Sequence, residues 1–199
     1  MPELDGRIAV VTGAGSGIGQ GIALVLAQRG ADIVVSDIDI VAAEAVADEI
    51  RSFGKNALAV QADVTEREST DALASTAITD LGRIDILVNN AGVGGAPGWW
   101  ERSSPSPEDW DATYDVNVIG IVNTTSSFQE HMSERRSGRV INIASGAGRR
   151  GAGGFAHYSA SKAAAINVSQ GFALKLAEFN INVNCICPGL LWTPLWEKI

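Results

Sequence analysis

Tyr158 and Lys162 stand four residues apart in the segment YSASK. On a helix, side chains with this spacing share a face about one turn apart. A free phenol has a pKa of about 10 and is a poor base at neutral pH. A nearby ammonium group stabilises the phenolate, so we expect Lys162 to lower the pKa of Tyr158 and make it a general acid and base. The same spacing is common on ordinary surface helices, so the pair needs support from its surroundings.

Two further polar residues could complete this site. Ser145 follows a predicted strand and precedes Tyr158 by 13 residues, so its hydroxyl could hold a substrate oxygen. Asn117 stands among Val and Ile residues of a predicted helix, where Asn is mildly unfavourable and competes for backbone hydrogen bonds. A functional amide and a satisfied core amide would both explain Asn117.

A glycine-rich segment, TGAGSGIG at residues 12–19, joins a predicted strand to a predicted helix. Glycine lets the backbone approach a pyrophosphate, and a helix N-terminus offers free N–H groups and the positive end of the helix dipole. The spacing is G-x-x-x-G-x-G rather than G-x-G-x-x-G, and tight packing alone could explain it. Its place between strand and helix favours a dinucleotide site. The cofactor contacts expected from this segment are Thr12, Gly13, Gly15, Ser16, Gly17, Ile18 and Gly19.

Asp37 follows the second predicted strand and lies 18 residues after Gly19. A carboxylate about 20 residues after such a loop accepts hydrogen bonds from the adenosine ribose. It would also repel a 2′-phosphate, and no Arg or Lys stands at residues 12–19 or 36–40 to receive one. We therefore predict NAD rather than NADP; the alternative is that Asp37 only caps a loop.

Short apolar runs alternate with helical patterns along the chain. Strands are predicted at residues 8–11, 33–35, 57–60, 84–88, 140–143 and 181–186. Helices are predicted from residue 18 to a C-cap at Gly30 and at residues 41–53, 65–81, 107–136 and 157–178. Thr65 is placed to cap the third helix, and Ser106 the fourth, with Pro107 at its first position.

This alternation predicts an α/β fold with three layers, doubly wound around a mostly parallel sheet in the order 3-2-1-4-5-6. Glycines cluster after strands one, four and five, at residues 13–21, 92–98 and 146–154. The loops after strands two and three lack such clusters, which turn formation alone does not explain. Since these loops share the carboxyl end of the sheet, we expect a ligand crevice there.

In their order and spacing these motifs resemble the short-chain dehydrogenase/reductase family, which has a Rossmann fold, over nearly the whole chain. The resemblance implies an oxidoreductase that transfers a hydride between NAD and a secondary alcohol or ketone. It makes Tyr158 the general acid and base and has Lys162 lower its pKa and bind the nicotinamide ribose. Ser145 would hold the substrate oxygen, and Asn117 would anchor a water in a proton relay through Lys162.

The resemblance also extends the cofactor site. It implies adenine contacts from Asp63 and Val64, a segment over the adenosine ribose in Asn89, Asn90, Ala91 and Gly92, and a nicotinamide-side loop in Pro188, Gly189 and Thr193. Thr193 would contact the carboxamide.

Tryptophans follow two of the loops that should overhang the cleft. Trp99 precedes Trp100 after the fourth strand, and Trp192 and Trp196 follow Pro188. They suggest an apolar wall for a carbon-rich substrate, although packing or a subunit contact explains them equally well. We expect Trp110 in the core.

Other reactive side chains suggest no site. His157 should face the surface or a partner, because adjacent helix residues point in different directions, and His131 should be solvated. The same holds for the pairs Arg135-Arg136 and Arg149-Arg150. Cys185 and Cys187 share one face of a strand as buried small residues and form no metal site.

Composition bounds the class of protein. The chain has 199 residues, of which 46% are hydrophobic and 19% charged, so we expect one globular domain over residues 1–199. The net charge of −8 argues against nucleic-acid binding. No apolar run reaches the roughly 18 residues of a membrane span, and the N-terminus lacks a secretory pattern. With only two cysteines, a reducing cytoplasm is expected.

One feature departs from the family pattern. Family members continue past the substrate loop into another helix and a seventh strand, whereas this chain stops at Ile199. An incomplete lid and an exposed sixth strand are therefore expected. The resemblance also implies a homotetramer or homodimer built through residues 107–136 and 157–178. A non-catalytic NAD sensor or an interaction subunit on the same fold stays open, although a sensor needs none of the four catalytic residues.

Overall fold

The computed structural model describes residues 3–151 and 153–193. All six strands occur where the apolar runs predict them, with ends that differ by up to two residues. The elements are β1 (Ile8–Thr12), α1 (Gly17–Gln28), β2 (Asp32–Asp37), α2 (Ile40–Ser52), β3 (Ala57–Gln61), α3 (Arg67–Leu81), β4 (Ile86–Asn89), η1 (Trp99–Glu101), α4 (Pro107–Tyr114), η2 (Asp115–Ile119), α5 (Gly120–Glu134), β5 (Gly138–Ile143), η3 (Gly146–Gly148), α6 (Ala156–Leu176), η4 (Ala177–Phe179) and β6 (Ile181–Ile186).

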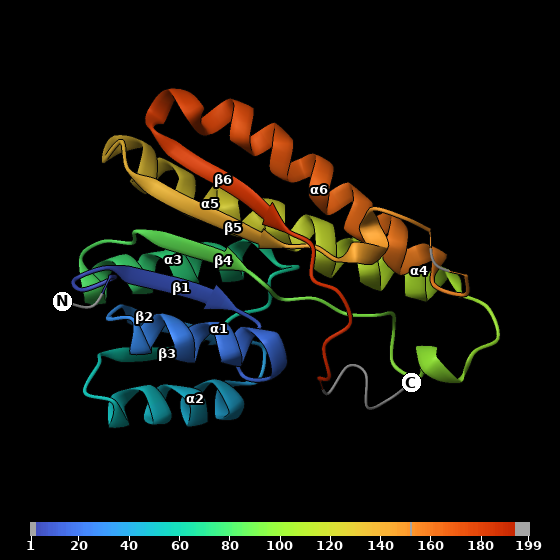
Figure 1. Ribbon diagram of the computed structural model, residues 1–199, viewed down its shortest axis with the longest axis horizontal. Helices are drawn as coiled ribbons and strands as arrows, with labels where there is room; N and C mark the ends of the chain where they lie inside the picture. Colours follow the sequence, from blue (N-terminus) through green and yellow to red (C-terminus); the bar gives the residue numbers. More distant parts are fainter. Residues whose placement is uncertain (1–2, 152, 194–199) are drawn as a thin grey trace.

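The six strands form one parallel sheet in the order β3-β2-β1-β4-β5-β6, which confirms the predicted fold (Figure 1). β1 lies between β2 and β4, so that Val10 pairs with Val34 on one side and Leu87 on the other. Every residue of β1 is buried because helices cover both faces of the sheet.

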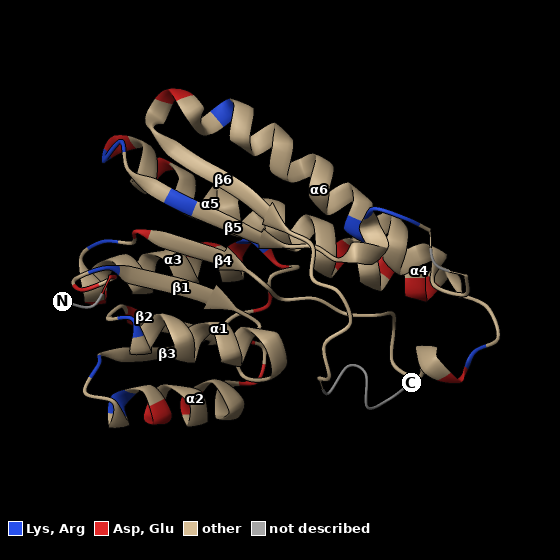
Figure 2. Ribbon diagram, viewed as in Figure 1, with Lys and Arg blue, Asp and Glu red and all other residues tan. Residues whose placement is uncertain are grey.

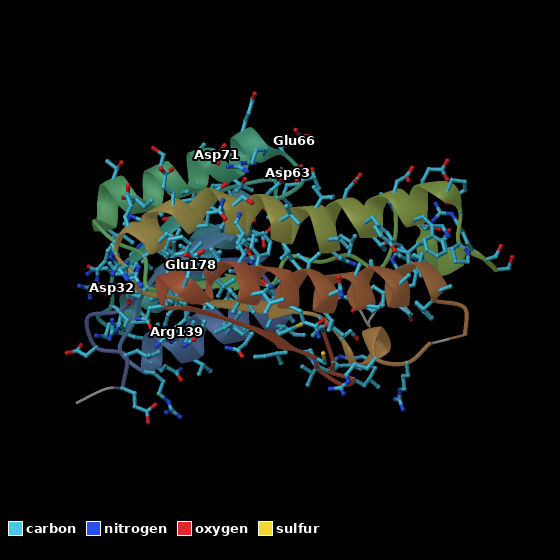
Figure 3. All side chains as sticks on the ribbon, turned by 90° about the horizontal axis from the view of Figure 1, so that it is seen from above. Asp32, Asp63, Glu66, Asp71, Arg139 and Glu178 are labelled. Atoms are coloured by element: carbon cyan, nitrogen blue, oxygen red, sulfur yellow. The ribbon has the colours of Figure 1, made fainter. Side chains whose placement is uncertain are left out.

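Two apolar clusters fill the spaces between the layers. Small and branched side chains of α1 and α2, such as Ala23 and Ile50, pack on one face. Larger side chains of α3, α5 and α6, such as Phe128 and Leu176, pack on the other. Viewed from above, α5 lies between α3 and α6 (Figure 3). The labelled Asp71 of α3 accepts a hydrogen bond from Ser127 of α5 at 2.7 Å.

The amino end of the sheet carries a charged cluster where basic residues gather (Figure 2). Buried Asp85 accepts the Ile8 N–H at 3.0 Å and pairs with Arg7, Arg83 and Arg135. Burial opposes its ionisation, but these hydrogen bonds and charges outweigh burial and lower the pKa of Asp85. Ligands of such sheets bind at the carboxyl end, where the glycine loops lie, so we assign this cluster at the amino end a structural role.

Two expectations for this region are wrong. His131 is half-buried, and its Nε2 accepts the Ile84 N–H at 3.2 Å. Burial lowers the pKa of His131. Arg135 donates to the Ile84 carbonyl besides pairing with Asp85, so it is not simply solvated either. Arg136, Arg149 and Arg150 are exposed, as expected.

The predicted helix 107–136 is not α-helical throughout. A π-helical turn, η2, separates α4 from α5 and contains Asn117. The predicted start is confirmed, because the Asp109 carboxylate accepts the Ser106 N–H at 2.9 Å. Trp110 is 39% exposed rather than in the core. No described helix has the length and apolar character needed to cross a membrane.

Thr65 does not cap α3. The helix begins at Arg67, with Glu66 in the N-cap position and no side-chain cap. The Thr65 hydroxyl instead donates to Asp63 Oδ1 at 2.8 Å. Thr65 therefore shapes the loop after β3.

Candidate active site

A cavity of about 350 Å³ opens at the carboxyl end of the sheet. It brings together the first turn of α1, the loops after β2, β3 and β4, and the first turns of α6. Its lining consists of Gly13, Ser16, Gly17, Ile18, Asp37, Ile38, Ala62, Asp63, Val64, Asn90, Ala91, Gly92, Val93, Val116, Ile143, Ala144, Tyr158, Lys162 and Thr193. Most of the residues expected from the sequence are therefore neighbours in one cavity.

The glycine loop has the backbone geometry of a close cradle. Gly13 and Gly17 have φ values of +60° and +57°, which L side chains rarely adopt. A Cβ at Gly19 would lie 2.1 Å from the Gly13 carbonyl oxygen. Ser16 makes no side-chain cap, and the first turn of α1 has no acidic residue. The free N–H groups of this first turn can therefore donate hydrogen bonds to a bound anion.

Thr12 holds this loop to the loop after β4 and does not line the cavity. Its hydroxyl oxygen accepts the N–H groups of Asn90 and Ala91 at 3.1 and 3.2 Å. Asn90 Nδ2 donates in return to the carbonyls of Thr12 and Gly13, both at 3.0 Å. The two loops therefore form one hydrogen-bonded unit.

Asp37 ends β2 at the far side of the cavity. Its Oδ2 accepts the Gly15 N–H at 2.8 Å, and its Oδ1 accepts the Asp39 N–H at 3.1 Å. An ionised carboxylate can accept about four hydrogen bonds, so capacity remains for ligand hydroxyls. Lys162, at the other end, is the one basic side chain among the described lining residues.

Tyr158, Lys162 and Ser145 meet where α6 packs beside the end of β5. Lys162 is 4% exposed, and its Nζ donates to the Ile143 carbonyl at 3.0 Å. The same Nζ lies 5.7 Å from the centre of the Tyr158 ring. Ser145 forms a side-chain hydrogen bond with Tyr158 and accepts the Ala147 N–H at 3.1 Å. The phenol, the hydroxyl and the ammonium thus form one group.

The protonation equilibria differ from the expectation. Burial raises the pKa of Tyr158 above its usual 10, and the hydrogen bond with Ser145 opposes this only in part. The pKa of Tyr158 therefore lies above its usual value rather than below it, because burial outweighs the hydrogen bond with Ser145, and the Lys162 ammonium donates to the Ile143 carbonyl. Burial also lowers the pKa of Lys162 to about 8. Tyr158 is consequently a neutral phenol, the form that can donate a proton.

Asn117 is fully buried in the π-helical turn. Its Oδ1 accepts the Val93 N–H at 2.8 Å, and its Nδ2 donates to the Val93 carbonyl and to Ser161 Oγ, both at 3.0 Å. Both ends of the amide are occupied, as in a satisfied core amide. The side chain fixes the segment after β4 against α6, and its Oδ1 keeps a second lone pair for a further hydrogen bond.

None of the described tryptophans is among the residues that line this cavity. Trp99 is only 8% exposed and lines a separate hollow of about 240 Å³ with Trp100, Phe155 and His157. Trp192 is 81% exposed, and Trp196 lies outside the described residues. Of the substrate contacts expected from the sequence, only Ser145 touches the catalytic group.

The nicotinamide-side loop is only partly in place. Thr193 lines the cavity, while Pro188 accepts the Gly146 N–H on its carbonyl at 2.8 Å and Gly189 lies away from the lining. Cys185 and Cys187 are free, half-buried thiols, and they pack against Ile121, Ala144 and Ala165 as small residues. No group of three His, Cys, Asp or Glu that could hold a metal occurs in residues 3–151 and 153–193.

Sequence reasoning missed several residues of the site. Val93, Val116, Ile143 and Ala144 line the cavity, and each lies within two residues of a predicted site residue. His157 was expected at the surface, but it is 2% exposed. Its only local signal is its place next to Tyr158.

The chain is similar to a large set of known proteins. The profile of the family described as short chain dehydrogenase matches residues 7–199. The chain is 38% identical to the (2S)-[(R)-hydroxy(phenyl)methyl]succinyl-CoA dehydrogenase subunit BbsD of Thauera aromatica, over 98% of the chain and 77% of that protein. It is 40% identical to the 7alpha-hydroxysteroid dehydrogenase of Escherichia coli K12, over 99% of the chain and 76% of the enzyme.

Solved structures agree with these relatives. A 7alpha-hydroxysteroid dehydrogenase complexed with NADH and 7-oxo glycochenodeoxycholic acid superimposes with a TM-score of 0.91 at 38% identity, covering 98% of this chain and 75% of that one. An NAD⁺-bound xylitol dehydrogenase gives a TM-score of 0.91 at 34% identity, with coverage of 98% and 74%.

Proposed function

We propose, from the premise that the chain belongs to the short-chain dehydrogenase family, that it transfers a hydride between NAD and a secondary alcohol or ketone. As a member of this family it is an oxidoreductase acting on CH–OH groups. The placement of Tyr158, Ser145 and Lys162 at one end of a cavity, with Asp37 at the other, carries the proposal.

The residues of the cavity suit a nicotinamide dinucleotide. The positive-φ glycines and the uncapped N-terminus of α1 suit its pyrophosphate, and Asp37 suits the adenosine ribose. Asp63, Val64, Asn90, Ala91, Gly92 and Thr193 all line the cavity. In the proposal Asp63 and Val64 contact the adenine, residues 90–92 cover the adenosine ribose, and Thr193 contacts the carboxamide. When bound, the nicotinamide supplies the carbon that gives or takes the hydride.

Tyr158 has the protonation state that carbonyl reduction requires. Its raised pKa keeps the phenol protonated, so it can donate its proton to a substrate oxygen held by the Ser145 hydroxyl. Alcohol oxidation runs the same transfer backwards. Lys162 with its pKa of about 8 is mostly cationic at neutral pH, so it stabilises the phenolate that reduction leaves and can return a proton to it. Asn117 supports the site by fixing Val93 and Ser161.

Names of relatives support a carbon-rich substrate. Three are named for a 7alpha-hydroxysteroid, cyclohexanol and a hydroxy(phenyl)methyl compound. Trp192 is exposed and adjoins in sequence the cavity-lining Thr193, which supports a role for its ring as an apolar wall for the substrate. A substrate screen that favours small polyols would contradict this.

Association through α4, η2 and α6 is also part of the proposal. Large apolar side chains are exposed on these elements at Trp110, Tyr114, Ile119 and Leu174. Exposed apolar side chains are stabilised when a second subunit covers them, so these side chains support a homodimer or homotetramer.

The test compares kcat/KM for NAD and NADP, with cyclohexanol and a 7α-hydroxysteroid as substrates and absorbance at 340 nm as the readout. We expect NAD to be preferred at least about tenfold, because the Asp37 carboxylate repels a 2′-phosphate. Asp37→Ala should raise KM for NAD about tenfold and reduce the preference, since it removes a charged hydrogen-bond acceptor.

The matched control is Asp48→Ala at an exposed position of α2, which should leave both values unchanged. A preference for NADP by the parent chain would contradict the cofactor assignment. NADH binding without turnover of any secondary alcohol or ketone would favour a non-catalytic sensor or interaction subunit instead.

A further inference from the structure

His157 occupies an unusual position beside the catalytic phenol. It is 2% exposed, and its ring packs near Trp99, Trp110 and Phe155 with centroid separations of 6.2 to 6.5 Å. Its Nε2 lies 2.7 Å from the Gly94 carbonyl oxygen. A carbonyl only accepts hydrogen bonds, so Nε2 carries the proton and donates it.

This hydrogen bond rules out a direct acid–base role for His157. Nε2 is engaged by Gly94, and Nδ1 is buried without a partner among the described residues. Neither nitrogen is open to exchange a proton with a substrate. What the ring can do is hold the Gly94 carbonyl in place.

The backbone that His157 holds continues into the cofactor cavity. Gly92 and Val93 line that cavity. Asn117 binds both the N–H and the carbonyl of Val93. A Cβ at Gly92 would lie 3.1 Å from Asn117 Oδ1 and 3.2 Å from Lys162 Nζ, so there is no room for a larger side chain between this backbone and the ammonium.

From the same helix, on either side of Tyr158, His157 is hydrogen-bonded to Gly94 and the Lys162 ammonium lies next to Gly92. The segment is anchored in its middle by Asn117 and at its end by His157. A Cβ at Gly94 or Gly95 would lie within 2.6 Å of Trp99, so the Trp99 side chain packs directly against the backbone of these two glycines. The hydrogen bond from His157 joins the first turn of α6 to this packed segment.

We infer that His157 is a positioning residue: its hydrogen bond to the Gly94 carbonyl fixes residues 92–94 under Lys162 and so sets the spacing between the bound cofactor and Tyr158. The inference rests on the proposed function. It assigns His157 no contact with substrate or cofactor.

The test uses variants of the full chain, with NADH fluorescence titration and steady-state kinetics as readouts. His157→Phe keeps a ring of similar size and removes the donor, so NADH affinity should fall about fivefold and kcat about tenfold. In His157→Gln the side-chain amide can donate at a reach like that of Nε2, so both values should return to within about twofold of the parent.

Two further variants keep the outcome decisive. His157→Asn has a donor that is too short to reach Gly94 and should behave like His157→Phe, which covers the case that the latter does not fold. His131→Phe, at the opposite end of the sheet, should leave NADH affinity unchanged. Parental affinity and kcat in both His157→Phe and His157→Asn, or equal loss in His157→Gln, would overturn the inference.

Failure of the inference and failure of the proposed function give different results. The NADH titration needs no turnover, so it decides the role of His157 even if the parent oxidises no substrate. Absence of turnover by the parent would count against the proposed function alone.

Discussion

Lys162 is a buried cation whose Nζ donates to a backbone carbonyl. Removing a cation from water is costly, so burial lowers the pKa of Lys162 to about 8 and makes the amine easier to deprotonate than an exposed lysine. Its i,i+4 spacing from Tyr158 is visible in the sequence, whereas the direction of its ammonium depends on where β5 ends. The pair was therefore predictable from the sequence, but the raised pKa of Tyr158 was not, because burial depends on distant segments.

The cost of burying Lys162 should appear in the pH dependence of stability. Below about pH 8 both folded and unfolded chains are protonated, and the full cost is present. Between the folded pKa and the ordinary lysine pKa of 10.5 only the unfolded chain holds the proton, so stability rises with pH. Lys162→Met removes the cost. The unfolding free energy of the variant minus that of the parent should therefore be about 3 kcal/mol larger at pH 7 than at pH 10. Urea unfolding at both pH values measures this; a difference independent of pH would refute it.

At the scale of elements, apolar periodicity and glycine positions predicted the strands and most helices. The π-helical turn at Asp115–Ile119 was missed because one extra residue in a helical ladder leaves the apolar pattern almost intact. The unfavourable Asn117 was the one local sign of it. The glycine loop before α1 was predicted correctly, because positive φ and close contact both demand glycine.

The α1 loop offers a matched pair of substitutions. Gly19→Ala would place a Cβ 2.1 Å from the Gly13 oxygen and 2.4 Å from Asn90 Nδ2, so we expect a lower melting temperature and at least a tenfold loss of NADH affinity. Gly21→Ala, on the same helix, meets nothing within 4 Å and should gain up to about 1 kcal/mol from helix propensity with unchanged affinity. Thermal unfolding and NADH titration check both. Equal affinity in the two variants would show that the loop is not a close cradle.

On the scale of the whole molecule, the two ends of the sheet have different tasks. The amino end holds the Asp85 cluster, which ties β1, β4 and α5 together, and the carboxyl end gathers the glycine loops and the polar side chains. The crevice at the carboxyl end follows from parallel strands, so the sequence predicts it, whereas the Asp85 cluster at the amino end was not predicted. The burial of His157 does not follow from any local pattern, because the segment that covers it, with Trp99, comes from more than 50 residues earlier in the chain.

The most direct measurement is the turnover of Tyr158→Phe with NAD and a secondary alcohol that the parent oxidises. Tyr114→Phe is the control, because Tyr114 is the other tyrosine of the chain and is exposed on α4. Without the phenolic proton, kcat/KM should fall about 10³-fold while NADH affinity stays within about twofold, and Tyr114→Phe should match the parent. Near-parental turnover by Tyr158→Phe would contradict the assignment of Tyr158 as the acid and base of this site.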